Sequence, residues 1–140
     1  MGQYHILVNY DKQEIVHPHA IGLGLKQWEH IGFEGGTLAD ALYILTTASP
    51  ARGGGDLPLT PVTGRWVGDR VMVVGDYTED GDIPGIENAG LLYATAENDF
   101  VDISDEVGQA MGSVFDFDLV GSTGWVSREY HKDRQATVSL

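Results

Sequence analysis

The chain lacks cysteine, a long apolar run and, over one long stretch, any cation. Its 140 residues contain no cysteine, which excludes disulfides, thiolate zinc sites and a cysteine nucleophile. No apolar run approaches the roughly 18–20 residues of a membrane span. Residues 1–10 also lack the basic-then-apolar order of a signal peptide. These absences predict a cytoplasmic protein that does not engage a membrane.

One long stretch of the sequence is acidic because it contains no lysine or arginine. Between Val71 and Val126 there is no lysine or arginine, but there are twelve carboxylates: Asp76, Glu79, Asp80, Asp82, Glu87, Glu97, Asp99, Asp102, Asp105, Glu106, Asp116 and Asp118. The rest of the chain is nearly neutral, so this stretch carries essentially the whole formal net charge of −13. A field of one sign repels nucleic acid and attracts cations or basic proteins. The sequence therefore predicts a protein partner with a basic surface, without direct nucleic-acid binding.

Length and residue patterns predict the fold class. A chain of 140 residues with 42% hydrophobic residues fits one domain, residues 1–140, with a core that needs no disulfide. Apolar runs bounded by turn residues predict three hairpins: 4–10 with 14–17, 62–67 with 70–75, and 91–96 with 100–103. Helical spacing predicts three helices: 22–31, 37–45 behind the capping pair Thr37 and Asp40, and 104–115 behind Ser104.

The expected result is a single α+β domain with a mostly antiparallel sheet and two or three helices. Residues 71–74 are apolar on both faces, which predicts a central strand in which Val73→Asp would unfold the domain. Trp28 and Trp66 are expected in the core.

The first half of the chain contains a series of distinctive short motifs. In order they are Met1-Gly-Gln-Tyr4, Val8-Asn-Tyr-Asp11, Pro18-His19, Gly22-Leu-Gly-Leu-Lys26, Arg52-Gly-Gly-Gly-Asp-Leu57, Gly64-Arg-Trp-Val-Gly-Asp-Arg70 and Gly75-Asp-Tyr77. This series resembles a family of small uncharacterised proteins of actinobacteria and their phages. The resemblance implies an accessory protein of a phage or an actinobacterium, located in the host cytoplasm if a phage encodes it. It implies no reaction.

One acidic segment is similar to a calcium-binding loop. Residues 76–87 read Asp-Tyr-Thr-Glu-Asp-Gly-Asp-Ile-Pro-Gly-Ile-Glu, close to the twelve-residue EF-hand pattern. Thr78 stands where that pattern has Asp or Asn, and a predicted strand precedes the loop where an EF-hand has a helix. A solvated acidic loop is the favoured interpretation. The alternative is a Ca²⁺ site formed by Asp76, Asp80, Asp82 and Glu87.

Histidines and one aspartate give weaker chemical candidates. His17 and His19, two residues apart in an extended segment, could bind Zn²⁺ or Ni²⁺ with Asp56 or His30 as a third ligand. A structural histidine is the favoured interpretation. His19 with Asp56 is also the candidate catalytic pair, because a carboxylate that orients an imidazole is the minimum general-base arrangement.

The glycine run before Asp56 is a candidate anion site. Arg52, Gly53, Gly54 and Gly55 could form a nest, because consecutive glycines let backbone N–H groups converge on a phosphate. The run lacks the Lys-Ser/Thr of a P-loop, and the chain has no Gly-x-Ser-x-Gly elbow. A tight connection between helix and sheet is the default interpretation.

Three functions remain open at this point. The favoured one is a non-enzymatic protein that binds a host or defence protein, in one version by nucleic-acid mimicry, because spaced carboxylates imitate phosphates. Its candidate contact residues are Glu97, Asp99, Asp102, Asp105, Glu106 and Trp125. The alternatives are a virion-associated structural protein, and a small enzyme or nucleotide- or metal-binding domain that uses His19, Asp56 and the Gly53–Gly55 loop.

Overall fold

The computed structural model describes residues 2–31, 37–49, 51–115, 117–119 and 125–127, and side chains up to residue 114. The elements are β1 (His5–Asn9), β2 (Glu14–Val16), η1 (Pro18–Ile21), η2 (Gln27–His30), α1 (Leu38–Leu45), β3 (Val71–Gly75), η3 (Ala89–Leu91), α2 (Leu92–Asp99), β4 (Val101–Asp102), α3 (Ser104–Phe115), β5 (Phe117–Leu119) and β6 (Trp125–Ser127). Those marked η are 3₁₀ helices. The predicted α+β class is confirmed. None of the described helices has the length and apolar character needed to cross a membrane.

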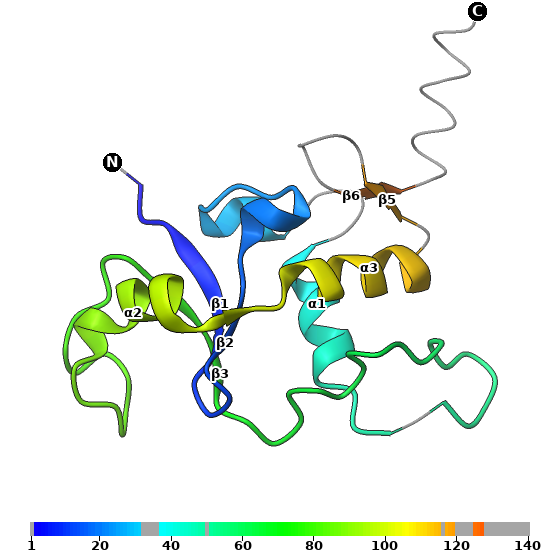
Figure 1. Cartoon of the computed structure of the whole chain (residues 1–140), viewed down its shortest axis with the longest axis horizontal. Helices are drawn as coiled ribbons and strands as arrows, with labels where there is room; N and C mark the ends of the chain where they lie inside the picture. Colours follow the sequence, from blue (N-terminus) through cyan, green and yellow to red (C-terminus); the bar gives the residue numbers. More distant parts are fainter. Residues whose placement is uncertain (1, 32–36, 50, 116, 120–124, 128–140) are drawn as a thin grey trace, which may run out of the picture.

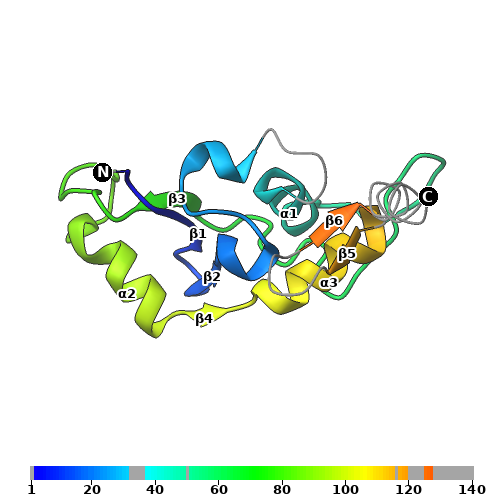
Figure 2. The same cartoon turned by 90° about the horizontal axis from the view of Figure 1, so that it is seen from above.

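A four-stranded sheet in the order β3-β1-β2-β4 forms the centre of the fold, and Figure 2 shows these strands in that order. The opening hairpin is confirmed, since β1 pairs antiparallel with β2. β3 lies antiparallel on the other side of β1, and β4 runs parallel to β2. The sheet is therefore mixed rather than purely antiparallel. A separate antiparallel pair joins β5 and β6.

Each face of the sheet has its own apolar cluster. Alternation along β1 sends Ile6 and Val8 to one face, where Leu92 and Ala96 of α2 cover them. Leu7 points to the other face and packs in the larger cluster with η1, α1, α3 and Trp66. In Figure 1 the strands accordingly lie between α2 on the left and α1 with α3 on the right.

Two predicted helices are present. α1 begins after Thr37, whose Oγ1 accepts a hydrogen bond from Asp40 N at 3.3 Å while Asp40 Oδ2 accepts from Thr37 N at 3.1 Å. This is the predicted reciprocal cap. α3 begins at Ser104, but the Ser104 hydroxyl does not cap it. Its Oγ instead accepts from His17 N at 2.7 Å and so fixes the helix to the end of β2.

The predicted strand at 62–67 is wrong, because these residues form a succession of turns. Bonds such as Val67 N to Gly64 O (3.1 Å) close residues three apart. Gly64 N and Trp66 N donate to Ile44 O and Leu45 O at 2.9 Å each, at the end of α1. The segment satisfies its backbone against α1 instead of a neighbouring strand. Gly64 adopts φ +75°, a conformation that favours glycine.

The predicted hairpin of 91–96 with 100–103 is also wrong. Residues 92–99 form α2, and β4 then pairs with β2. Leu92 and Ala96, four residues apart, are both buried against the sheet, whereas Leu91 is 64% exposed. Burial at helical spacing therefore decided the conformation of a segment whose local pattern also fitted a strand.

β3 is an edge strand, so the predicted central position of residues 71–74 is wrong. Its one neighbour in the described sheet is β1. Val74 is 1% exposed, but Val73 is 46% exposed. Because Val73 is partly exposed at this edge, we no longer expect Val73→Asp to unfold the domain.

The predicted helix at 22–31 shrinks to the single turn η2. Leu25 lies against β1, because His5 N donates to Leu25 O at 2.7 Å, and this contact holds the residues before η2 out of a helix. Trp28 is 83% exposed, which overturns its predicted place in the core. Trp66 is 1% exposed, as predicted.

Candidate functional site

Glu14, the first residue of β2, is a buried carboxylate held by the turn segment. Arg65 donates to it through Nε at 3.0 Å and through Nη2, and Trp66 Nε1 donates to Oε1 at 2.8 Å. Burial alone would raise the pKa of Glu14, but the bonds from Arg65 and Trp66 outweigh burial and leave that pKa below its ordinary value. The charged carboxylate therefore links β2 to the turn segment that contains Arg65 and Trp66.

A second polar cluster closes the turn between β1 and β2. Asn9 Nδ2 donates to Asp69 Oδ2 at 2.9 Å, and Lys12 forms an ion pair with the same oxygen. Arg70 donates from Nε and Nη2 to Asp11 Oδ1 at 2.9 Å and 2.7 Å. The bond from Lys12 lowers the pKa of Asp69, and the bond from Arg70 lowers that of Asp11.

These two clusters join motifs that lie far apart in the sequence. Residues 8–12 and Glu14 meet residues 65–70. Asp76 Oδ1 likewise accepts from Tyr4 N at 2.9 Å, which joins the first motif to the last. The polar groups of these motifs are thus engaged with one another. They hold the fold together rather than facing a ligand.

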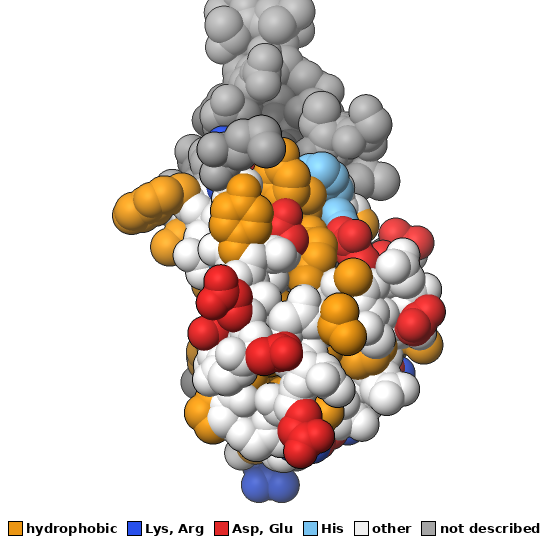
Figure 3. Space-filling model, turned by 90° about the vertical axis from the view of Figure 1, so that its left-hand side faces the viewer, with side chains coloured by type: hydrophobic (Ala, Val, Ile, Leu, Met, Phe, Trp, Pro, Cys, Tyr) orange, Lys and Arg blue, Asp and Glu red, His pale blue; other side chains and the backbone are white. Residues whose placement is uncertain are grey.

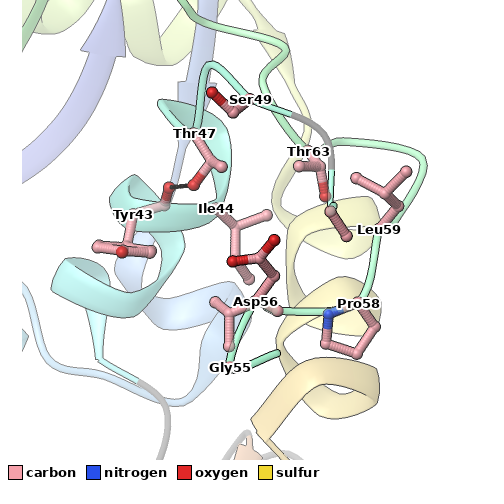
Figure 4. A pocket seen from close by; sticks show the side chains of 11 residues that line it. Tyr43, Ile44, Thr47, Ser49, Gly55, Asp56, Pro58, Leu59 and Thr63 are labelled. Carbon is pink, nitrogen blue, oxygen red and sulfur yellow. Dashed lines mark hydrogen bonds between the residues drawn. The ribbon is translucent and has the colours of Figure 1, made fainter. Parts of the chain in front are cut away.

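The triple-glycine loop borders a small hollow against α1 (Figure 4). The hollow has a volume of about 180 Å³, and its lining includes Tyr43 and Ile44 from α1, Thr47 just after that helix, and Asp56, Pro58 and Leu59 from the loop. Figure 4 shows the Asp56 carboxylate beside Ile44. Pockets for small-molecule ligands usually hold about 300 Å³ or more. This hollow is small for a substrate.

The Asp56 carboxylate closes its own loop. Its Oδ2 accepts from Arg52 N at 2.7 Å and from Gly53 N at 2.9 Å. These two backbone bonds lower the pKa of Asp56. The N–H groups at the start of the predicted anion nest, Arg52 to Gly55, therefore already bind an anion that belongs to the chain.

His19 and Asp56 are not joined as a catalytic pair. There is no hydrogen bond or ion pair between their side chains, although both residues lie in the described part. The imidazole that meets a carboxylate is His17, whose Nε2 lies 3.2 Å from Glu97 Oε2. The rings of His17 and His19 are 5.5 Å apart between centroids. Among the described residues, no group of three or more His, Asp or Glu side chains could hold a metal ion, so a third ligand for this pair is missing.

The carboxylates of the predicted calcium loop do not converge. Three of them accept from separate backbone N–H groups: Asp76 from Tyr4 at 2.9 Å, Asp80 from Gly90 at 2.8 Å and Asp82 from Glu79 at 2.9 Å. Glu87 is exposed. Calcium binding stays a prediction, and it would require the loop to rearrange.

The structure places the acidic charge at the surface. All ten carboxylates of residues 76–106, here called the acidic segment, are exposed: Asp76, Glu79, Asp80, Asp82, Glu87, Glu97, Asp99, Asp102, Asp105 and Glu106. Figure 3 shows acidic side chains spread over the face formed by the left-hand side of Figure 1. Lys12, Arg65 and Arg70 pair with carboxylates outside this segment. Within the described residues, no lysine or arginine forms an ion pair with the acidic segment.

The predicted partner-binding carboxylates lie on α2, β4 and the first turn of α3: Glu97, Asp99, Asp102, Asp105 and Glu106. Two of them also bond within the fold. Glu97 accepts from Tyr93 Oη at 3.2 Å, and Asp102 Oδ1 accepts from Ser104 N at 2.9 Å. Trp125 lies in β6, and its side chain falls outside the described residues.

Known proteins add nothing to this geometry. No family model, curated protein or solved structure matches the chain. The resemblance to phage and actinobacterial proteins stays a prediction, and function has to follow from the side chains themselves.

The sequence did not reveal a buried pair of histidines. His5 in β1 and His30 at the end of η2 are 9% and 4% exposed, with ring centroids 6.4 Å apart and ring planes at 88°. His5 Nδ1 and His30 Nε2 are buried without a hydrogen-bond partner among the described residues. Burial, and then the charge of His5, lower the pKa of His30. Alternation could place His5 on an inner face, but no local signal shows that η2 packs over it.

Proposed function

We propose that this protein is not an enzyme and acts by binding a protein partner through its acidic segment. The observation that carries the proposal is the exposure of all ten carboxylates without a lysine or arginine partner in the described residues. Charges of one sign repel each other and destabilise the compact state. A partner with a basic surface relieves that repulsion on binding. A nucleic-acid-binding protein of the host is one natural source of such a surface.

The other candidate sites favour binding over catalysis. Asp56 is engaged by the backbone of its own loop, and the hollow beside it holds only about 180 Å³. Glu14 and the motif residues Asp11 and Asp69 are engaged by Arg65, Arg70 and Lys12, respectively. The acidic segment is thus the described surface with the largest set of charges left for a partner.

Charge recognition of this kind has a measurable signature. Exposed charges steer the encounter between two proteins and raise the association rate, and salt screens them beyond about 8 Å at physiological ionic strength. Binding by the acidic segment should therefore weaken as salt is added.

The test is affinity capture from a lysate of the native host at low and high ionic strength with three versions of the protein. The first is the wild type. The second neutralises three exposed carboxylates without hydrogen bonds in the described part, through Glu79→Gln, Glu87→Gln and Asp99→Asn. The third adds three lysines at exposed positions around α1, through Ala39→Lys, Ala48→Lys and Ala51→Lys. Both variants make the formal net charge of −13 less negative by three.

We expect the wild type and the lysine control to retain the same basic protein at low salt and to lose it at high salt. The neutralised variant should retain much less of it. If nothing is retained at low salt, or if both variants lose the partner equally, the acidic segment is not the contact surface and the proposal fails.

A further inference from the structure

The exposed edge of β3 has a definite hydrogen-bonding pattern. Tyr10 N donates to Arg70 O and Asp76 N donates to Tyr4 O, each at 2.9 Å. In an antiparallel ladder, hydrogen-bonded residue pairs alternate with non-bonded ones. The backbone N–H and C=O groups of the even-numbered residues of β3 therefore point toward β1. The odd-numbered residues therefore turn both their N–H and their C=O away from β1. Val73 is the middle one of these.

The open part of this edge is short. Gly75 is closed by its own turn, because Gly75 N donates to Thr78 Oγ1 at 3.2 Å and Thr78 N donates to Gly75 O at 3.1 Å. The outward N–H and C=O groups of Val71 and Val73 have no hydrogen-bond partner within the part of the chain that the structure describes. Unpaired edge groups of this kind form a template for another strand.

An apolar hollow lies beside the same edge. It has a volume of about 420 Å³ and is lined by Gln27, Trp28, His30, Ile31 and Val73. Trp28, Ile31 and Val73 are 83%, 48% and 46% exposed. A residue added opposite Val73 shares its face of the sheet, so its side chain would project toward this hollow. Open backbone groups beside a pocket for a side chain are the two features that strand addition uses.

We propose that β3 pairs with β3 of a second copy of this chain, antiparallel and around a two-fold axis at Val73. The charges at the ends of the strand favour this occupant. Arg70, which also pairs with Asp11, precedes the strand, and Asp76, which also accepts from Tyr4 N, follows it. With Val73 opposite Val73, each Arg70 stands opposite Asp76 of the other copy, whereas a parallel pair would align like charges. The two Val73 residues exchange two backbone bonds and cover the hollows lined by Trp28.

Net charge makes this association distinct from binding of a basic partner. Each copy carries a formal charge of −13, so two copies repel each other at long range. Added salt screens that repulsion. The dimer therefore strengthens as salt is added, whereas binding of a basic protein by the acidic segment weakens. A strand of five residues with one open central pair also predicts a weak, concentration-dependent dimer.

The test is sedimentation equilibrium of the full chain over a range of concentrations at low and high salt, with four variants. Val73→Lys and Val73→Glu each place like charges opposite one another on the axis. Tyr43→Lys is the control, because Tyr43 is 64% exposed on α1, away from the edge. Trp28→Ala removes the largest apolar side chain of the hollow. Circular dichroism checks that each variant folds.

We expect the wild type and Tyr43→Lys to form dimers that strengthen with salt. Val73→Lys alone, Val73→Glu alone and Trp28→Ala should each raise the dimer dissociation constant about tenfold or more. An equimolar mixture of Val73→Lys and Val73→Glu should restore dimers, because opposite charges then meet at the axis. A wild type that stays monomeric at every concentration and salt, or a mixture that dimerises no better than either variant alone, overturns the proposal.

Discussion

At the scale of single residues, the most informative side chain is the buried Glu14. Its carboxylate accepts from Arg65 and Trp66 and is 5% exposed. The sequence shows an acid within a short apolar strand but does not name its partners, which lie about fifty residues later. Such a group stabilises the fold only while its bonds are intact.

The first prediction concerns this carboxylate. Glu14→Ala should lower the free energy of unfolding by about 2 kcal/mol or more, because Trp66 Nε1 then stays buried without an acceptor. Glu14→Gln should cost less, since the amide oxygen still accepts from Trp66. Lys12→Ala, which removes a solvent-screened ion pair with Asp69, should cost the least of the three. Urea denaturation measures all three. Equal losses for Glu14→Ala and Lys12→Ala would contradict this role.

The second prediction concerns pH and His30. Burial and His5 lower the pKa of His30 in the folded state, whereas the unfolded chain titrates near 6.5. Between these two values the unfolded chain binds more protons, so the free energy of unfolding falls as pH drops below about 6.5. His30→Gln should flatten this decline. Exposed His19→Gln should leave it unchanged.

Denaturant unfolding at about pH 7.5 and about pH 5.5 measures the difference for each variant. A decline that is as steep in His30→Gln as in the wild type would show that His30 does not report on folding.

Residue environments could be predicted only where the local pattern and the long-range packing agree. Trp66 is buried as expected, because the turns deliver it to the cluster beneath α1. Trp28 has helical spacing with Leu25 and Ile31, but Leu25 is bound to β1, so the helix never extends. The contact that decided this conformation lies about twenty residues away in the sequence.

At the scale of elements, α1 and α3 follow from local signals. The Thr37 and Asp40 pair and the apolar stripe of α1 are contained within the helix itself. β3 and α2 depend on neighbours instead. Whether an apolar strand is central or at an edge depends on how many strands pair with it, and residues 71–74 contain no signal for that number.

The third prediction contrasts two adjacent residues of β3. Val73→Asp should leave a cooperative fold and cost about 1 kcal/mol or less, because the side chain is 46% exposed. Val74→Asp should unfold the domain, because this residue is 1% exposed and the charge would have no partner. Thermal melts followed by circular dichroism decide between them. An unfolded Val73→Asp variant would show that the edge is covered.

At the scale of the whole molecule, the paired cations and the exposed carboxylates have different roles. Three of the described cations, Lys12, Arg65 and Arg70, lie in ion pairs that hold the turns to the sheet. The acidic segment lies outside these pairs. The sequence predicted this one-signed charge, because composition alone reveals it. It could not predict that the motif residues would bond one another, or that the Asp56 carboxylate would close its own loop, since both depend on backbone geometry.

We propose that the acidic segment recognises a basic protein by charge. The most direct test of this proposal is the association rate of the purified wild type with the protein it captures, measured against ionic strength by a surface biosensor. We predict that the association rate falls steeply with salt while the dissociation rate changes little. The Glu79→Gln, Glu87→Gln, Asp99→Asn variant should start slower at low salt and depend less on salt. An association rate that does not change with salt, or that is the same in this variant, would contradict the account.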